Sequence, residues 1–155
     1  MPTQVMRKKA ADNVYHHPDF HGGLSYGLEY LQDHYGPDAV REYLRQFTRT
    51  FFSPLRKEID KRGLEALRDH FTKLYKDEGG EATITLNGNE LIVDIAECPA
   101  VKHLRKRGHV VARMWSETSR TVNETLVEGT PFAAELVSYE EQTGRSIQRF
   151  YRRRA

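Results

Sequence analysis

Residues 82–95, which read ATITLNGNELIVDI, carry the clearest structural pattern in the chain. Apolar and polar residues alternate along 82–87 and again along 91–95. A period of two residues is typical of a strand with one buried face. The Asn87-Gly88 pair lies between the two runs, and both residue types accept the positive φ of a tight turn. The pattern therefore predicts a β-hairpin.

The residues before this hairpin repeat with the period of an α-helix. Leu28 and Tyr35 belong to one apolar helical face, and Leu44 and Phe51 belong to a second. Asp19 is a residue type that caps helix N-termini. The later boundaries fall at residues that end or begin helices, which are Gly36, Pro54, Gly63 and Gly79-Gly80. Four helices are therefore predicted ahead of the hairpin.

Two more helices and a second pair of strands follow the hairpin. Pro99 suits the first turn of a helix that ends at Gly108, and another helix is predicted over about 111–127. Alternation returns along 132–136 and 147–151, on either side of a polar turn. Runs of helices followed by hairpins argue for an α+β fold. We expect N-terminal helices and a four-stranded antiparallel sheet of two hairpins, with two helices inserted between the hairpins.

The composition limits the domain count and the class of protein. The 155 residues suit one domain, and we expect a flexible arm at 1–14 and a single α+β domain at 15–155. A net charge of +2 argues against a dedicated nucleic-acid-binding protein. No apolar run approaches the roughly 20 residues that span a bilayer, and no secretory signal is recognisable. We therefore expect a cytoplasmic protein that binds neither nucleic acid nor membrane.

Cys98 is the only cysteine, so no disulfide can form within the chain. It lies between a predicted strand and a predicted helix, with Pro99 at the first helical position, and is the expected N-cap. The helix N-terminus lowers the pKa of a thiol, and Lys102 and His103 add positive charge. This pattern fits a reactive or ligand-contacting cysteine. It fits a buried, inert one about as well, because free cysteine is among the most buried residue types.

A histidine cluster, His16, His17 and His21, lies at the start of the first predicted helix. His17 and His21 are four residues apart, which is the spacing of a metal-binding pair on a helix. Pro18 places His17 outside the helix, however, and no second pair completes a metal site. We therefore expect no metal and no cofactor. His21 is either a polar residue at a helix start or a wall of a ligand pocket.

Four later residues are candidates for substrate binding, namely Trp115, Thr118, Asn123 and Gln148. The first three belong to a predicted helix whose inner side is polar and could line a pocket. The alternative is a surface helix anchored by Trp115. Gln148 lies on the last predicted strand, where the register decides whether it points inward.

Three glycines interrupt the first predicted helix, namely Gly22, Gly23 and Gly27. Glycine in a helix costs about 1 kcal/mol relative to alanine. Their presence suggests close approach by another backbone or by a ligand. They do not have the spacing of a phosphate-binding loop.

Several short motifs carry a resemblance to a known family. They are Asp19-Phe20-His21, Tyr30-Leu31, Tyr35-Gly36, Tyr43-Leu44, Pro54-Leu55, Gly63-Leu64 and Cys98-Pro99-Ala100. Through them the chain resembles the L-2-amino-thiazoline-4-carboxylic acid hydrolase-like family over about residues 15–152. The resemblance implies hydrolytic opening of a thiazoline ring to a carbamoyl-cysteine product. Family members often have a further cysteine in the last strand region, where this chain has Ser146, and this departure puts a shared thiol chemistry in doubt.

Two functions follow as expectations. A hydrolase of a cyclic thiazoline- or amide-like substrate would use Cys98 as nucleophile or electrostatic contact and His103 or His21 for proton transfer. Thr118 and Asn123 would then orient the substrate. A non-catalytic binding or sensing domain would hold a small acidic or aromatic molecule in the same pocket.

Two protein contacts are further expectations from the sequence. Aromatic residues such as Phe52 or Tyr139, if exposed, would support a homodimer. The basic C-terminus, residues 152–155, offers a weaker possibility of contact with an acidic partner.

Overall fold

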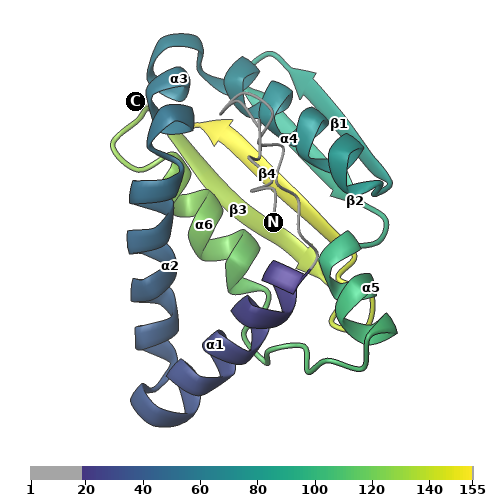
Figure 1. Ribbon diagram of the computed structural model, residues 1–155. Helices are drawn as coiled ribbons and strands as arrows, with labels where there is room; N and C mark the ends of the chain where they lie inside the picture. Colours follow the sequence, from purple (N-terminus) through teal and green to yellow (C-terminus); the bar gives the residue numbers. More distant parts are fainter. Residues whose placement is uncertain (1–18, 155) are drawn as a thin grey trace, which may run out of the picture.

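The computed structural model describes residues 19–154, which form an α+β fold (Figure 1). The elements are α1 (Asp19–Tyr35), α2 (Pro37–Phe51), α3 (Ser53–Arg62), α4 (Leu64–Glu78), β1 (Ala82–Asn87), β2 (Glu90–Ile95), α5 (Pro99–Lys106), α6 (Glu117–Leu126), β3 (Phe132–Tyr139) and β4 (Ser146–Arg152). This order confirms the predicted fold class. The arm expected at 1–14 lies outside the described residues. Within 19–154, no helix has the length and apolar character needed to cross a membrane.

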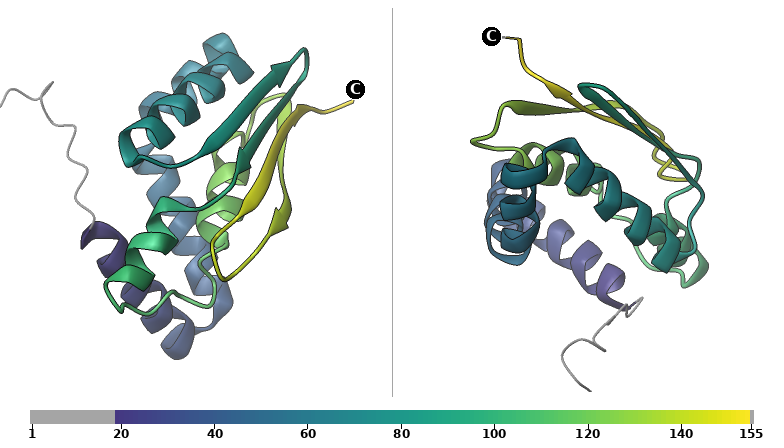
Figure 2. Two further views of the ribbon diagram at one scale, coloured as in Figure 1. Left: turned by 90° about the vertical axis from the view of Figure 1, so that its right-hand side faces the viewer. Right: turned by 90° about the horizontal axis from the view of Figure 1, so that it is seen from above.

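The strands form one antiparallel sheet in the order β1-β2-β4-β3. Asn87 pairs with Glu90 around Gly88, whose φ of 60° favours glycine, and this confirms the first hairpin. β4 lies between β2 and β3, so it joins the two hairpins into one sheet. Figure 2 shows the helices of residues 19–154 gathered on one face of the sheet. The fold therefore has two layers.

Two apolar clusters hold the layers together. The larger cluster lies between the sheet and the helices α3, α4 and α6, and it includes Leu91 and Phe150. The smaller cluster joins α1, α2 and α5 to the α5–α6 loop, and it includes Leu28 and Trp115. Full burial of one such side chain stabilises the fold by about 1.5–3 kcal/mol. Val122 on α6 packs against both clusters, so the two meet beneath this helix.

Helix α6 begins at Glu117, so the prediction of a helix from about 111 is wrong at its start. Residues 109–116 instead run along α1 as a loop. The Ser25 hydroxyl donates to the carbonyl oxygen of Val110 at 2.5 Å and accepts from the N–H of Ala112 at 2.8 Å. These bonds to α1 satisfy backbone groups of the loop that a helix would have satisfied internally.

Arg113 provides a second attachment of this loop to α1. Its N–H donates to the Glu29 carboxylate at 2.5 Å. Its guanidinium group forms ion pairs with Glu29 and Asp33. The loop is thus held at two points, and Trp115 lies two residues after the second, Arg113.

Four aromatic residues differ from the sequence prediction. Tyr35 and Phe51 continue apolar stripes but are exposed, because each is the last residue of its helix. Phe52 and Tyr139, which the sequence offered as exposed dimer contacts, are partly buried. Phe52 packs against the larger apolar cluster and Tyr139 against the smaller one, so their expected exposure is wrong.

Candidate functional site

Cys98 is the N-cap residue of α5, as predicted, with φ −76° and ψ 119°. Its N–H donates to the carbonyl oxygen of Thr143 at 3.0 Å, which ties it to the β3–β4 turn. A Cβ atom on Gly144 in that turn would overlap Cβ of Cys98 and lie 2.9 Å from Cγ2 of Val101. The turn therefore fixes the position of Cys98, whose side chain is partly buried.

Burial raises the pKa of the Cys98 thiol. Backbone N–H groups of Val101 and Ala100 lower it, as expected at a helix N-terminus, and the indole N–H of Trp115 also lowers it. The Glu78 carboxylate raises it further. Burial outweighs the helix end here, so the expectation of a lowered thiol pKa is wrong.

Three aromatic rings lie together on one side of Cys98. They belong to His21, His103 and Trp115. The centroid of the His21 ring is 6.3 Å from that of Trp115 and 6.4 Å from that of His103. Nε2 of His21 is 3.7 Å from Oε1 of Glu78. Nε2 of His103 is buried and has no hydrogen-bond partner among residues 19–154. A buried nitrogen without a partner costs about 1–3 kcal/mol, so a ligand that bonded to it would gain affinity.

Two amide side chains connect α6 to the sheet at this site. Nδ2 of Asn123 donates to Oε1 of Gln148 at 2.6 Å, and Nε2 of Gln148 donates to Oγ of Ser146 at 3.2 Å. Gln148 stands opposite the buried Val93 on the neighbouring strand, so it faces the helices. Its side chain also lies near the phenol group of Tyr75. The register that the sequence left open thus turns Gln148 inward.

Tyr75 and Tyr139 lie near enough to Cys98 to interact with its charge. Burial raises the pKa of both phenols, and a negative charge on Cys98 would raise both further. Tyr75, Tyr139 and Glu78 were not among the candidate site residues predicted from the sequence. The available signal was on α4, where Glu78 shares the inward face of Phe71 and Tyr75 at helical spacing.

The residues above form one group around the cysteine. We refer to it as the Cys98 cluster: Cys98, His21, Tyr75, His103, Trp115 and Gln148. Five of these six residues were candidates from the sequence. They come from four helices or loops and one strand, so only the fold brings them together.

Two residues that the sequence predicted near Cys98, Thr118 and Lys102, bond to other groups. The Thr118 hydroxyl donates to the carbonyl oxygen of Trp115 at 2.6 Å, so it supports the start of α6. The Lys102 ammonium lies 3.0 Å from the Glu97 carboxylate, which offsets the positive charge expected beside Cys98. Neither group therefore extends the Cys98 cluster.

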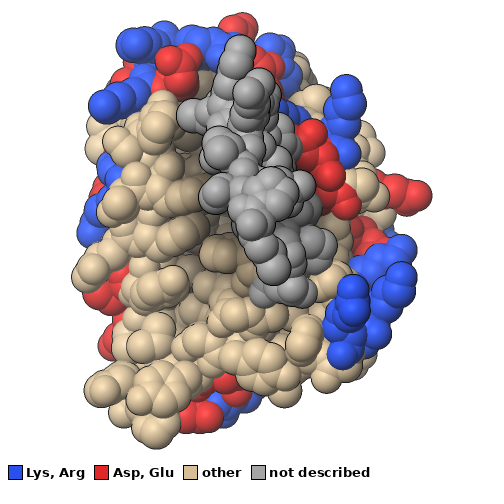
Figure 3. All heavy atoms as spheres, viewed as in Figure 1, with Lys and Arg blue, Asp and Glu red and all other residues tan. Residues whose placement is uncertain are grey.

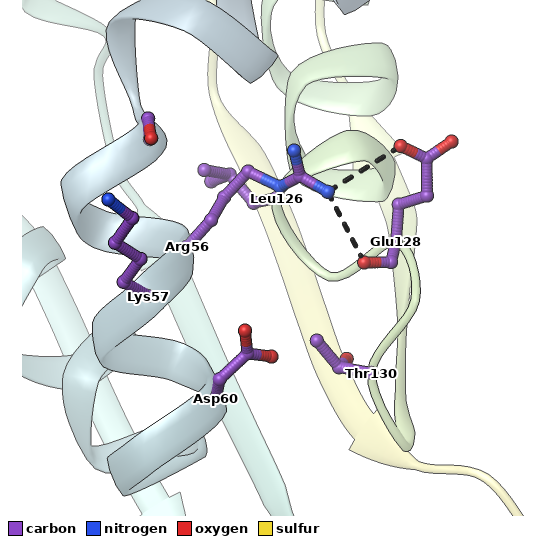
Figure 4. Close-up of a pocket in the computed structure, with 7 residues that line it drawn as sticks. Arg56, Lys57, Asp60, Leu126, Glu128 and Thr130 are labelled. Atoms are coloured by element: carbon purple, nitrogen blue, oxygen red, sulfur yellow. Dashed lines mark hydrogen bonds and ion pairs between the residues drawn. The ribbon is translucent and has the colours of Figure 1, made fainter.

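Two surface cavities lie away from this cluster. The first, of about 240 Å³, lies between α3 and the end of α6 (Figure 4). There Arg56 reaches the carbonyl oxygen of Glu128 at 3.5 Å and its carboxylate at 3.7 Å, with Lys57 and Asp60 on the same helix. The second, of about 460 Å³, includes Arg149 at the end of the sheet. Charged side chains occupy much of both walls.

The part of the chain that the structure describes holds no group of three or more His, Cys, Asp or Glu residues placed to bind a metal ion. His21 is the one member of the predicted histidine cluster within it. His16 and His17 lie outside the described residues.

No protein-family model matches the sequence, and no curated protein is significantly similar to it. The chemistry of the Cys98 cluster therefore has to be argued from its own residues.

Proposed function

We propose that the protein binds a small polar molecule, acidic or aromatic, at the Cys98 cluster. The observation that carries the proposal is the buried Nε2 atom of His103, which has no hydrogen-bond partner among the described residues. The His21 and Trp115 rings nearby offer flat apolar surfaces together with N–H groups. This combination suits a planar ligand that carries a polar group.

The state of the cysteine favours binding over nucleophilic catalysis. Burial raises the pKa of Cys98, so the thiol is protonated at neutral pH. A cysteine nucleophile acts as the thiolate and needs a base within about 3 Å. The thiol is better suited to line the site as a small apolar group.

Hydrolysis of a cyclic thiazoline- or amide-like substrate is the second candidate, in line with the family resemblance. The specific observation in its favour is the His21–Glu78 pair, with 3.7 Å between Nε2 and Oε1. A carboxylate beside an imidazole raises its basicity and orients it, so His21 would activate a water molecule. In this scheme Cys98 contacts the substrate and forms no bond to it. Both proposals place the protein in the cytoplasm.

Incubation with L-2-amino-thiazoline-4-carboxylate separates the two functions. A binding domain gains melting temperature with ligand concentration and releases no product. A hydrolase releases carbamoyl-cysteine, and His21→Gln abolishes the release. We expect His103→Gln to reduce the melting shift, and His109→Gln, on the α5–α6 loop, to leave it unchanged. The compound is added at about 100 µM, which is about 100 times a micromolar dissociation constant. If the wild-type protein then shows neither a shift in melting temperature nor carbamoyl-cysteine, this ligand class is excluded.

A further inference from the structure

Exposed aromatic side chains are concentrated on the first two helices. The exposed fractions are 56% for Phe20, 49% for Tyr26, 57% for Tyr30, 70% for Tyr35, 43% for Tyr43 and 65% for Phe51. The other large apolar residues exposed in the described chain are Val110 and Val137. An exposed apolar patch of this kind marks an interaction site more often than chance would allow. Tyr35 is rotated by about 180° from Tyr26 around α1, so we refer to the other five aromatic residues as the α1–α2 aromatic surface.

The solvent side of α1 carries no charged residue at its centre. Phe20, Gly23, Gly27, Tyr30 and His34 recur at spacings of three and four residues and therefore share one helical face. Figure 3 shows the same character over α1 and α2, where uncharged atoms predominate and charged side chains lie mainly towards the edges. A solvated helix face is normally rich in charge.

Two glycines on this face have no packing role within the described chain. A Cβ atom on Gly23 or Gly27 would meet nothing within 4 Å, whereas one on Gly22 would lie 3.4 Å from the His109 ring. Each exposed glycine makes the helix less stable than alanine would at the same position. The cost is offset where another backbone or ring approaches the helix closely.

The aromatic residues of α2 are already arranged as a stack. The rings of Phe47 and Phe51 lie 5.1 Å apart with an interplanar angle of 12°, and Tyr43 stacks on Phe47 at 6.5 Å. Stacked rings present a flat, rigid surface that loses little side-chain entropy on binding.

We propose that the α1–α2 aromatic surface is the interface of a homodimer with two-fold symmetry. At about 200 Å² per aromatic side chain, the exposed fractions of these five residues amount to about 540 Å². A stable interface buries about 800 Å² per partner, so this surface supplies most of the area that a dimer needs. Projecting rings and exposed glycines occur on the same face, so each copy offers both the knobs and the hollows that the other requires. The uncharged centre favours an identical partner over a charged one.

Sedimentation equilibrium of the full chain tests this interface. We expect the wild-type protein to be dimeric at about 100 µM and to dissociate on dilution. Tyr30→Glu and Phe51→Glu place like charges across the two-fold axis, so each raises the dissociation constant at least tenfold. Val137→Glu places the same charge on exposed β3 and leaves the dissociation constant unchanged. Circular dichroism confirms that each variant is folded.

Gly27→Ala gives a second, independent readout. In the dimer the added methyl group obstructs the close approach and raises the dissociation constant, while the isolated monomer gains melting temperature from the better helix former. A wild-type protein that stays monomeric at about 100 µM would overturn the proposal. So would dimerisation that Tyr30→Glu and Phe51→Glu do not affect.

Discussion

The side-chain amide of Asn123 on α6 donates to the amide oxygen of Gln148 on β4 at 2.6 Å, and both residues are buried. The bond crosses from the helical layer to the sheet where the two apolar clusters meet. Polar groups in such a position lose their contact with water and therefore depend on each other. Gln148 belongs to the Cys98 cluster and lies near Tyr75, so the bond also positions part of that cluster.

Replacement of Asn123 by leucine tests this dependence. Asn123→Leu leaves the Gln148 amide oxygen buried without its donor, so we expect a loss of about 1–3 kcal/mol in the free energy of unfolding. The double variant Asn123→Leu/Gln148→Leu removes both polar groups and recovers part of that loss. Urea denaturation of the two single variants and the double variant gives the coupling energy. Additive effects would show that the bond contributes little.

Gly144 should not tolerate a side chain. Its φ is 70°, and a Cβ atom there would overlap Cβ of Cys98. Gly144→Ala therefore combines backbone strain with overpacking, and each costs about 1–3 kcal/mol. Gly88→Ala is the matched control, because its φ is 60° and its Cβ position is empty. We expect a clearly larger fall in melting temperature for Gly144→Ala. Equal falls would mean that the turn moves away from Cys98 at little cost.

The thiol of Cys98 should react with an alkylating agent only at a higher pH than an exposed cysteine does, because burial raises its pKa. The ordinary pKa of a cysteine thiol is about 8.5, and the denatured protein should show this value as the midpoint pH of alkylation by iodoacetamide. Because burial raises the pKa of Cys98, we expect the midpoint pH of the native protein to be higher. Since the unfolded chain loses this proton first, the contribution of the thiol to stability is lost as pH rises above about 8.5. A native midpoint below that of the denatured chain would contradict the burial argument and favour a thiolate mechanism.

His70 should limit stability in mild acid. Burial, together with the charge of Lys73, lowers the pKa of His70 to about 4. The unfolded chain therefore binds this proton first, and the stability that neutral His70 contributes is complete above about pH 6.5 and lost as pH falls towards 4. We expect His70→Leu to flatten the decline of unfolding free energy across this range by up to about 3 kcal/mol. His34→Leu, at an exposed position, should keep the wild-type slope.

Local signals explain why most of the fold could be predicted. Asn87-Gly88 specifies its hairpin through backbone conformation alone, and Pro99 and Gly63 mark helix boundaries in the same way. The start of α6 was misplaced because Ser25, more than 80 residues earlier, bonds to the loop. A contact between residues far apart in the sequence does not change the hydrophobic period of either segment, so the period cannot predict it.

The sequence singled out five of the six residues of the Cys98 cluster, but it did not reveal the electrostatic environment of the thiol. The N-cap position of Cys98 follows from Pro99, and the inward orientation of Gln148 follows from alternation once the register is known. The pKa of the thiol depends on burial by Trp115 and the β3–β4 turn, which sequence spacing does not reveal. Tyr75 comes near Cys98 and Gln148 only because the fold brings α4 to them.

The place of β4 in the sheet determines when, during synthesis, the Cys98 cluster can form. β4 separates β2 from β3, yet it is the last of the four strands to leave the ribosome. Until it inserts, β2 has one unpaired edge with Leu91, Val93 and Ile95 exposed to other nascent chains, and pairings of this non-local kind form slowly. Gln148 arrives with the same strand, so a chain still being synthesised has no complete Cys98 cluster. A ligand of the proposed site would therefore bind and stabilise only those chains in which β4 has inserted.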